Sequence, residues 1–508
     1  MLPFLHSAFT IDDTVFLLEA EHAMEHPLAP PDFEIVWFDR PESISALQRS
    51  GRMMAWLLIP SILAGGSEWV AHLTQIILFS CGILATVIIA LRCQFLLVEA
   101  RLAGLLVAAT PACLGIASTS MPDIAAMTFG VLGAERLTAW LISKRWHQPA
   151  LGLMFLGLGA YSRVHIAPLA VVLSLACLLL QQRQAAAENR PDMLGPVTFR
   201  QSMLPWGIGL LLPCAVLAAL WLRTFDVVSA LRLFRPPYIA SNAVAFLVHW
   251  AVAVPLVIPW LVIRGHVINW KLAPFLGVPV FAALIWLHRE ARVSVALVAI
   301  VSLLCLIDII KYCVSRRTWF HWVLLAWLFV PLPVIIYPHF PSKYLVVSVP
   351  AVALLLIEAM RSSSSRLKHV TIAITLIAGA TLGIAIVSAS AALAEPGRMI
   401  SRELIAPLAQ QGRRVWFHGH WGFQWYAQRA GARPLASVPP FPQPNDIIVA
   451  SSSSAYGASL DQVAPHRTLL GKAFTFHPGG RVMGDGAGFF PITGVIGHGH
   501  GDRATSIK

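Results

Sequence analysis

The sequence predicts an α-helical membrane protein that crosses the bilayer about twelve times and ends in a small α/β domain outside it. Three observations support this fold class. The 508-residue chain is 57% hydrophobic and 12% charged, whereas soluble domains carry roughly 25% charged residues. Its apolar residues gather in segments near the length, about 20 residues, that a helix needs to cross a bilayer. From residue 395 onward the composition shifts toward Gly, Pro, Ser and His.

Three regions follow in chain order. Residues 1–68 are expected to form a first external loop that carries an acidic pair. Within it, residues 53–64 are apolar but too short to cross, which is typical of an interfacial helix. Residues 69–394 form the multi-span transmembrane domain. Residues 395–508 form the external C-terminal domain.

The transmembrane domain is predicted from a series of apolar segments. The 149–162 segment is short and fits a half-span or a steeply packed helix. The predicted spans are 69–91, 102–118, 123–142, 149–162, 164–181, 204–222, 243–263, 272–288, 293–311, 319–337, 343–360 and 369–393.

The net charge of +12 is explained by topology and anionic lipid headgroups and not by nucleic acid, because the Lys and Arg residues lie mainly between apolar runs. One alternate set of loops is richer in these residues, and the positive-inside rule places that set in the cytoplasm. An even number of spans then places both ends of the chain outside. The expected location is a bacterial inner (plasma) membrane, with the site on the extracytoplasmic side.

The C-terminal region reads as short strands between turn residues. The runs 414–417 and 446–450 are apolar and bounded by turn formers, which predicts strands, and 401–411 predicts a helix. None of the seven cysteines lies in this region and no CxxC pair occurs, so neither a metal site nor a disulfide framework is indicated. No basic segment or cleavage site that would mark a signal peptide is found at the start.

Asp12 and Asp13 are the first candidate catalytic residues. Two adjacent carboxylates in a partly dry pocket cannot both ionise cheaply, so one is expected to be a base poised near neutral pH. It would take a proton from an acceptor hydroxyl while the other orients the acceptor or holds a cation. The alternative is a solvated pair that starts a helix, since Asp before TVFLL is a good helix start.

Asp123 and Arg163 lie on the same predicted external face as the pair. Asp123 follows Pro122 and suits the first turn of a helix, which explains it without any function; its place opposite the pair favours catalysis. Arg163 lies between two predicted spans, where a cation suits a lipid-linked phosphate. Its alternative is snorkelling toward the interface.

Lys343 and Tyr344 open a late span after a Pro-rich loop. Lysine binds phosphate as a point charge and tyrosine adds a hydrogen-bond donor, whereas both are also common membrane-interface anchors. His420 and Trp421 lie in an aromatic run of the C-terminal region. Such side chains can stack on sugars and bind hydroxyls, or form that region's core or its contact with the membrane. No third metal ligand is suitably spaced there.

These stretches resemble a known family. FTIDDTVFLLEAEH at 9–22, with HPL at 26–28 and IVW at 35–37, is similar to the first external loop of GT-C-type membrane glycosyltransferases. Family 39 is the closest in pattern; it includes the protein O-mannosyltransferases, with lipid A aminoarabinose transferases as relatives. Further similarities are TSMPD at 119–123, GLGAYSR at 157–163, SKY at 342–344 and HWGFQWY at 420–426.

Two positions depart from the family pattern. Lys343 stands where the family has Arg, so the bidentate fork is lost. Family members also carry a span before the pair, whereas this chain begins nearly at it.

The resemblance implies an inverting transfer of a sugar from a polyprenyl-phosphate donor to a hydroxyl of a protein, lipid or glycan acceptor. Asp12 would be the general base, Asp13 and Asp123 would orient the acceptor, and Arg163 and Lys343 would hold the phosphate. A divalent cation fits this scheme but is not required by it. The alternatives are a lipid or sugar transporter or flippase, and a non-catalytic assembly protein that keeps the GT-C-like fold.

Overall fold

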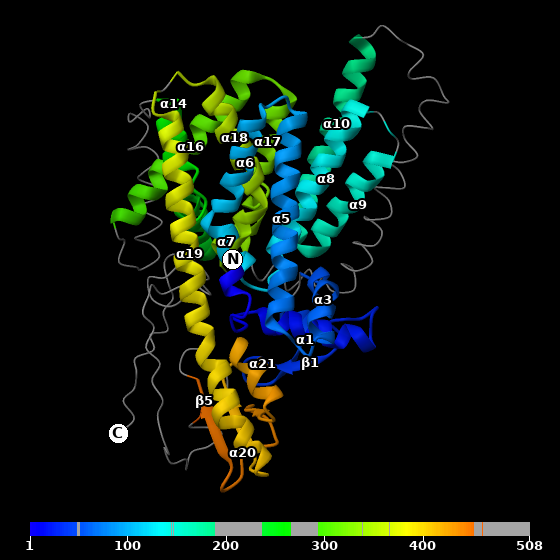
Figure 1. Ribbon diagram of the computed structural model, residues 1–508, viewed down its shortest axis with the longest axis vertical. Coiled ribbons are helices and arrows are strands. Elements are labelled where there is room, and N and C mark those ends of the chain that lie inside the picture. Colours follow the sequence, from blue (N-terminus) through cyan, green and yellow to red (C-terminus); the bar gives the residue numbers. More distant parts are fainter. Residues whose placement is uncertain are drawn as a thin grey trace.

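The computed structural model describes residues 1–47, 51–143, 145, 147–187, 236–265, 293–337, 339–364, 366–451 and 460. It is a helical bundle whose longest helix, α19, runs the length of the molecule (Figure 1). The N-terminal elements lie at one end of the bundle, between it and the elements of the C-terminal region (Figure 1). Three parts of the chain that are far apart in sequence therefore meet at this end.

The helices of the N-terminal part and the first half of the bundle are η1 Leu2–Phe4, α1 Asp13–Glu25, α2 Ile44–Leu47, α3 Met53–Leu57, α4 Ile59–Leu63, α5 Glu68–Arg92, α6 Leu97–Ala109, α7 Pro111–Ala117, α8 Asp123–Ser143, α9 His147–Ser162, η2 Val164–Ile166 and α10 Ala167–Ala187. The later helices are α13 Pro236–Val252, α14 Val257–Arg264, α16 Val293–Arg316, α17 Trp319–Leu328, η5 Leu332–Ile336, η6 Ser342–Ser348, α18 Val349–Ser362, α19 Lys368–Ile400, the π-helical turn η7 Ser401–Ile405, α20 Ala406–Gln410 and α21 Gly422–Arg429.

Within the described residues, five helices are long and apolar enough to cross a membrane, or up to seven if each of two bent pairs is one span. The bent pairs are α6 with α7 at 60° and α13 with α14 at 61°. All ten predicted spans that fall on described residues are largely helical, but their number as spans stays a prediction. The predicted spans 204–222 and 272–288 lie outside the described residues.

The first bent pair has a visible cause in the sequence. Pro111 follows Thr110, which takes an extended backbone and ends α6. A residue before proline is disfavoured in the helical region, while proline itself suits the first position of a new helix. The sequence predicted one span over 102–118, and the chain instead changes direction in the middle of it.

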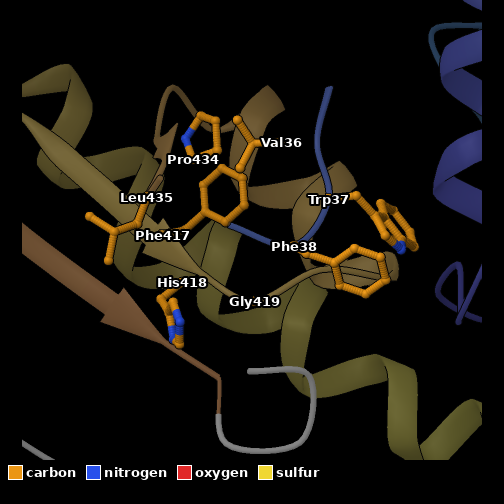
Figure 2. A pocket seen from close by; sticks show the side chains of 8 residues that line it. All are labelled: Val36, Trp37, Phe38, Phe417, His418, Gly419, Pro434 and Leu435. Carbon is orange, nitrogen blue, oxygen red and sulfur yellow. The ribbon is translucent and has the colours of Figure 1, made fainter. Parts of the chain in front are cut away.

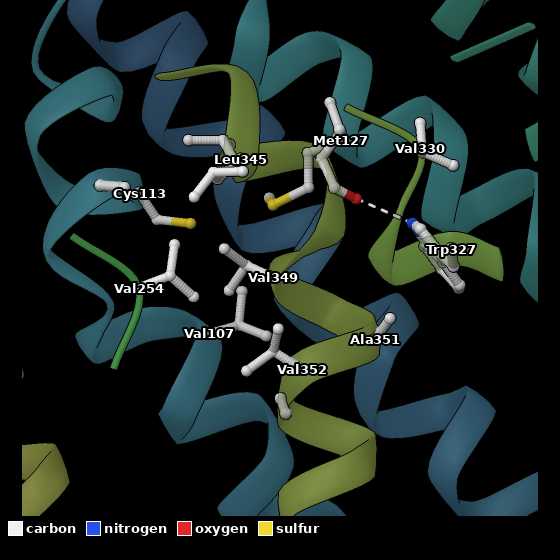
Figure 3. Close-up of a cluster of buried hydrophobic side chains, with 14 of the residues drawn as sticks. Val107, Cys113, Met127, Val254, Trp327, Val330, Leu345, Val349, Ala351 and Val352 are labelled. Carbon is white, nitrogen blue, oxygen red and sulfur yellow. Dashed lines mark hydrogen bonds between the residues drawn. The ribbon is translucent and has the colours of Figure 1, made fainter. Parts of the chain in front are cut away.

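The core of the bundle surrounds η6 and α18, whose joint apolar segment is 94% buried, whereas the apolar segments of α5 and α19 are 39% and 28% buried. Figure 3 shows Val107, Cys113, Met127, Leu345 and Val349 meeting there from several helices. The partly exposed α5 and α19 present apolar side chains outward, which is expected of helices that face lipid. The exposed apolar side chains of α5 and α19 therefore lie on the outside of the bundle.

Close approach of α19 to the bundle depends on glycine. A Cβ at Gly379 would lie 2.5 Å from the carbonyl oxygen of Ala109, and one at Gly383 would lie 2.4 Å from the Leu114 side chain. Small residues at such positions let helix backbones pack closely in membranes.

The end of the bundle that holds both terminal regions also carries the strands. β1 (Glu34–Val36) pairs antiparallel with β2 (Pro41–Ser43). In the C-terminal region β3 (Val415–His418) lies between β4 (Arg433–Pro434) and β5 (Ile447–Ala450), with both pairings parallel. The strands predicted at 414–417 and 446–450 are confirmed as β3 and β5.

The predicted helix at 401–411 is also helical, as η7 and α20. It continues directly from α19, so the helix passes without a break through the position at which the sequence places the start of the external domain.

Candidate functional site

Asp12 lies at the start of α1, at the edge of the bundle. Its Oδ2 is 3.3 Å from the Nζ of Lys343. The Asp12 side chain is 36% exposed, whereas that of Lys343 is 10% exposed. The preceding residue, Ile11, has φ of 42°, a left-handed backbone that a β-branched side chain rarely adopts. The local chain thus holds one accessible carboxylate against one nearly buried ammonium group.

Asp13 points the other way, into the protein. Its Oδ2 accepts a hydrogen bond of 2.9 Å from the backbone N–H of Thr10, and its Oδ1 accepts one of 2.7 Å from Ser120. Burial raises the pKa of Asp13 from 3.8 to about 7, against the two N–H donors, which lower it. The carboxylate whose pKa is raised toward neutral is therefore Asp13, the buried member of the pair, which has no exposed surface.

Through these two hydrogen bonds, Asp13 holds two stretches of backbone together. It joins the segment before α1 to the loop before α8, the helix that begins with Asp123. Its expected part in orienting an acceptor stays a prediction.

Asp123 and Arg163 form a bidentate ion pair in the interior. The Nε and Nη2 atoms of Arg163 donate to Asp123 at 3.0 and 2.8 Å. Asp123 is fully buried and Arg163 is 4% exposed. Pro122 places Asp123 in the first turn of α8, and Arg163 comes directly after α9. The Asp123 carboxylate already compensates the charge of Arg163. To bind a phosphate as well, the Arg163 guanidinium would have to contact both anions.

Tyr344 connects the two ion pairs. It follows Lys343 in η6, and its ring lies 5.7 Å from the guanidinium carbon of Arg163. The ring of His165 packs edge-on against the same tyrosine, with 5.7 Å between centroids. All these side chains are buried.

The loop before Lys343 adds a residue that the sequence analysis did not select. Burial, and then the neighbouring Lys343 ammonium, lower the pKa of His339 to about 4, so this imidazole is neutral at physiological pH. The only sequence signal was its place in the Pro-rich loop at 337–344.

His420 and Trp421 lie outside this polar cluster. His420 is 1% exposed and packs against Trp37, Phe38 and Trp421 with ring centroids 5.1, 5.9 and 4.8 Å away. The Trp421 carbonyl accepts a 2.5 Å hydrogen bond from the Thr14 hydroxyl. These residues therefore join the C-terminal region to the N-terminal one.

Figure 2 shows a cavity beside them, lined by residues that include Trp37, Phe38, Phe417 and His418. Its volume of about 10 Å³ matches one water molecule, which is far too small for a sugar ring.

A second buried ion pair was also missed by sequence analysis. Glu19, on α1, is fully buried and pairs with Arg52, which precedes α3 and is 7% exposed. Burial raises the pKa of Glu19 to about 7, against Arg52, which lowers it. The pair ties α1 to the short helices α3 and α4. Sequence spacing gives no sign of it, because the two residues are 33 positions apart.

Within the described part of the chain, no group of three His, Cys, Asp or Glu side chains is arranged to hold a metal ion. The site therefore consists, in that part, of the accessible Asp12–Lys343 pair, with the buried Asp123–Arg163 pair and Tyr344 behind it. An accessible carboxylate can accept a proton, and an ammonium beside it can bind an anion.

No protein-family model matches the chain, and no curated protein matches it. Two solved structures are similar to it. A crystal structure of ArnT from Cupriavidus metallidurans bound to undecaprenyl phosphate is 13% identical, covers 89% of this chain and 88% of that one, and gives a TM-score of 0.42. The same protein in the apo state is 13% identical over 84% and 82%, with a TM-score of 0.37. Likenesses of this size establish neither fold nor activity.

Proposed function

We propose that the protein is a membrane glycosyltransferase. It moves a sugar from a polyprenyl-phosphate donor to an acceptor hydroxyl at the outer face of the membrane, with inversion at the anomeric carbon and Asp12 as the general base. The observation that carries this proposal is the contact of 3.3 Å between partly exposed Asp12 and nearly buried Lys343, at the edge of an apolar helical bundle. The sequence resemblance described above supports the same reaction.

The reaction needs one group to accept a proton and another to stabilise a leaving phosphate. The acceptor oxygen bonds to the anomeric carbon, and its proton passes to the Asp12 carboxylate. The bond between that carbon and the phosphate oxygen breaks, and the electron pair leaves with the polyprenyl phosphate. Lys343 stabilises the negative charge that develops on this phosphate.

The contact between the two side chains has a consequence for substrate binding. A donor phosphate that binds Lys343 replaces the Asp12 carboxylate as its counter-ion. Asp12 is then released toward the acceptor. Because the Lys343 side chain is only 10% exposed, this exchange takes place where charge interactions are stronger than in water.

The buried pair behind the site has a supporting role in this scheme. Asp123 holds Arg163, and Arg163 lies over the Tyr344 ring, one residue from Lys343. Arg163 would add a second positive charge for the phosphate if its guanidinium binds the phosphate and Asp123 at the same time. Asp13 holds the loop that carries Asp12.

The proposal is tested in membranes that contain the protein, with a panel of radiolabelled polyprenyl-phosphate sugars. Asp12→Asn removes the base while keeping the shape of the side chain, and Asp32→Asn is a matched control at an exposed position. We expect one donor to lose its label with wild type and the control, and not with Asp12→Asn. Equal consumption by Asp12→Asn contradicts the proposed base.

Consumption of no donor by folded protein contradicts the enzymatic proposal itself. A transporter or flippase, or a non-catalytic assembly protein, would then be favoured. A flippase is distinguished by movement of the labelled lipid across the bilayer without loss of its sugar.

A further inference from the structure

We propose that the C-terminal helix α21 is a positioning element for Asp12, with Gly422 and Tyr426 as its positioning residues. This inference rests on the proposed function, and it assigns to the C-terminal region a role in the reaction other than binding the acceptor. It is carried by contacts between α21 and the segment 9–14, which contains Asp12 and Asp13. These two parts of the chain are separated by more than 400 positions.

The first contact is a hydrogen-bond relay through Tyr426. Its hydroxyl accepts a bond of 2.8 Å from the backbone N–H of Phe9 and donates one of 3.0 Å to the Oε1 of Glu68. Arg398 donates to the same Glu68 oxygen at 3.2 Å. The Tyr426 hydroxyl thus donates its one proton to the Glu68 carboxylate and accepts the Phe9 N–H with a lone pair, so each donor faces an acceptor.

The second contact is a close approach of two backbones. A Cβ added to Gly422 would lie 1.8 Å from the carbonyl oxygen of Phe9 and 2.7 Å from its carbonyl carbon. Only glycine can occupy this position without a shift of the main chain. Next to it, Trp421 has φ of 61°, and its carbonyl accepts the hydrogen bond from the Thr14 hydroxyl.

Aromatic packing adds to this contact. The Phe9 ring meets Trp425 edge-on and stacks on Tyr426, with centroids 5.9 and 6.2 Å away. Because Phe9 is fully buried, its ring and its backbone are both fixed by α21. The contact is therefore made through the main chain and the side chain together.

The opposite side of the same segment is held by the bundle. Asp13 accepts from Thr10 within the segment and from Ser120 in the loop before α8. Ile11, between these anchors, keeps its left-handed backbone at φ 42°. Such a conformation persists only where the surroundings impose it. Asp12 thus projects from a segment that is clamped on one side by α21 and on the other by the bundle.

The inference is tested with Tyr426→Phe and Gly422→Ala. Tyr426→Phe keeps the ring but removes the partner of the Phe9 amide, and Gly422→Ala forces the backbones apart. Two controls match them. Tyr312→Phe removes a tyrosine hydroxyl that contacts Ser362 elsewhere in the bundle. Val415→Ala removes a buried side chain from the core of the C-terminal region, which includes Phe423 and Ala427 of α21, while the Gly422 and Tyr426 contacts with Phe9 are made by other atoms.

The first readout is hydrogen exchange of the amides of residues 9–14 in the full-length protein, followed by mass spectrometry. We expect it to be about threefold to tenfold faster in Tyr426→Phe and faster still in Gly422→Ala, with no change in Tyr312→Phe. This readout does not depend on any enzymatic activity. Unchanged exchange in both test variants overturns the inference, even if the protein transfers no sugar.

The second readout is the rate of transfer with the donor that wild type consumes. A displaced base lowers kcat, on the order of 100-fold for a shift near 1 Å. The KM for the donor should stay unchanged or fall, because Lys343 keeps its place while the Asp12 carboxylate that competes with the phosphate moves away. Val415→Ala destabilises the C-terminal region but should keep the wild-type kcat. A similar fall in kcat in Val415→Ala and Tyr426→Phe would show a merely structural role and overturn the inference.

Discussion

Replacing Asp123 by Asn separates the structural role of the buried ion pair from its role in the site. The change leaves the Arg163 guanidinium 4% exposed without the carboxylate that accepts bonds of 2.8 and 3.0 Å from it. Loss of one partner from a buried pair typically costs about 3–5 kcal/mol. Replacement of both partners by apolar residues is often close to neutral.

The prediction is a lower stability for Asp123→Asn and a recovery in the double variant Asp123→Leu with Arg163→Met. Thermal unfolding in detergent measures it. We expect a fall in Tm on the order of 5–10 °C for the single variant, and less than half of that for the double variant. Asp32→Asn, at an exposed position, should stay within about 1–2 °C of wild type.

The reasoning is refuted if Asp123→Asn is as stable as wild type, because the pair would then not be buried as described. It is also refuted if the double variant is less stable than the single one. Transfer by the stable double variant would further show that neither charge is needed for the reaction.

Three further predictions concern the site and the packing. Asp12→Asn should bind polyprenyl phosphate about tenfold more tightly, since it removes the carboxylate that competes for Lys343, and Lys343→Gln should bind it about tenfold more weakly; equal affinities in a direct binding assay would contradict this competition. Because the pKa of Asp13 is raised from 3.8 to about 7 in the folded protein, the folded state holds more protons between these values. Stability should therefore fall as pH rises through this window, with Asp13 contributing up to about 1.4 kcal/mol per pH unit and Glu19, whose pKa is also raised to about 7, acting in the same direction. Asp13→Asn should make the dependence of Tm on pH less steep; an unchanged slope would exclude Asp13 as a contributor. Gly379→Ala should lower stability by about 1–3 kcal/mol because its Cβ would lie 2.5 Å from a carbonyl oxygen, whereas Gly130→Ala meets only contacts of 3.6 Å and longer; equal Tm values for the two would contradict the packing of α19.

The elements of the bundle were largely predictable from apolar run lengths. The segments that became α5 and α19 are continuous and unbroken, so period and length were sufficient to find them. The bend at Pro111 was not predicted because a hydropathy window averages over one proline. The strands β3 and β5 were found because turn residues bound both of them.

Most of the side chains selected from the sequence lie close together in the structure, but the sequence did not indicate their partners. Their catalytic and binding roles stay predictions. Asp12 and Asp13 are adjacent in sequence, and successive residues of a helix point about 100° apart. Sequence cannot tell which of the two faces inward, so it could not assign Asp13 to Ser120 and Asp12 to Lys343. Pairings over such separations depend on how the whole bundle packs.

The contact of α21 with the segment 9–14 was equally hidden. Gly422 and Tyr426 belong to an aromatic run that the sequence analysis considered for sugar binding or for a core. Only the structure shows that Gly422 lies against the Phe9 backbone. A glycine between aromatic residues was the one available signal, and such a signal has many explanations.

The central claim is that Asp12 acts as a base on a lipid-linked sugar donor. The most direct measurement is loss of label from radiolabelled polyprenyl-phosphate sugars in membranes that contain wild type, Asp12→Asn or Asp32→Asn. The account predicts that wild type and Asp32→Asn consume one donor at similar rates, while Asp12→Asn consumes at least about 100-fold less of it. Equal consumption by Asp12→Asn, or consumption of no donor by folded wild type, would contradict it.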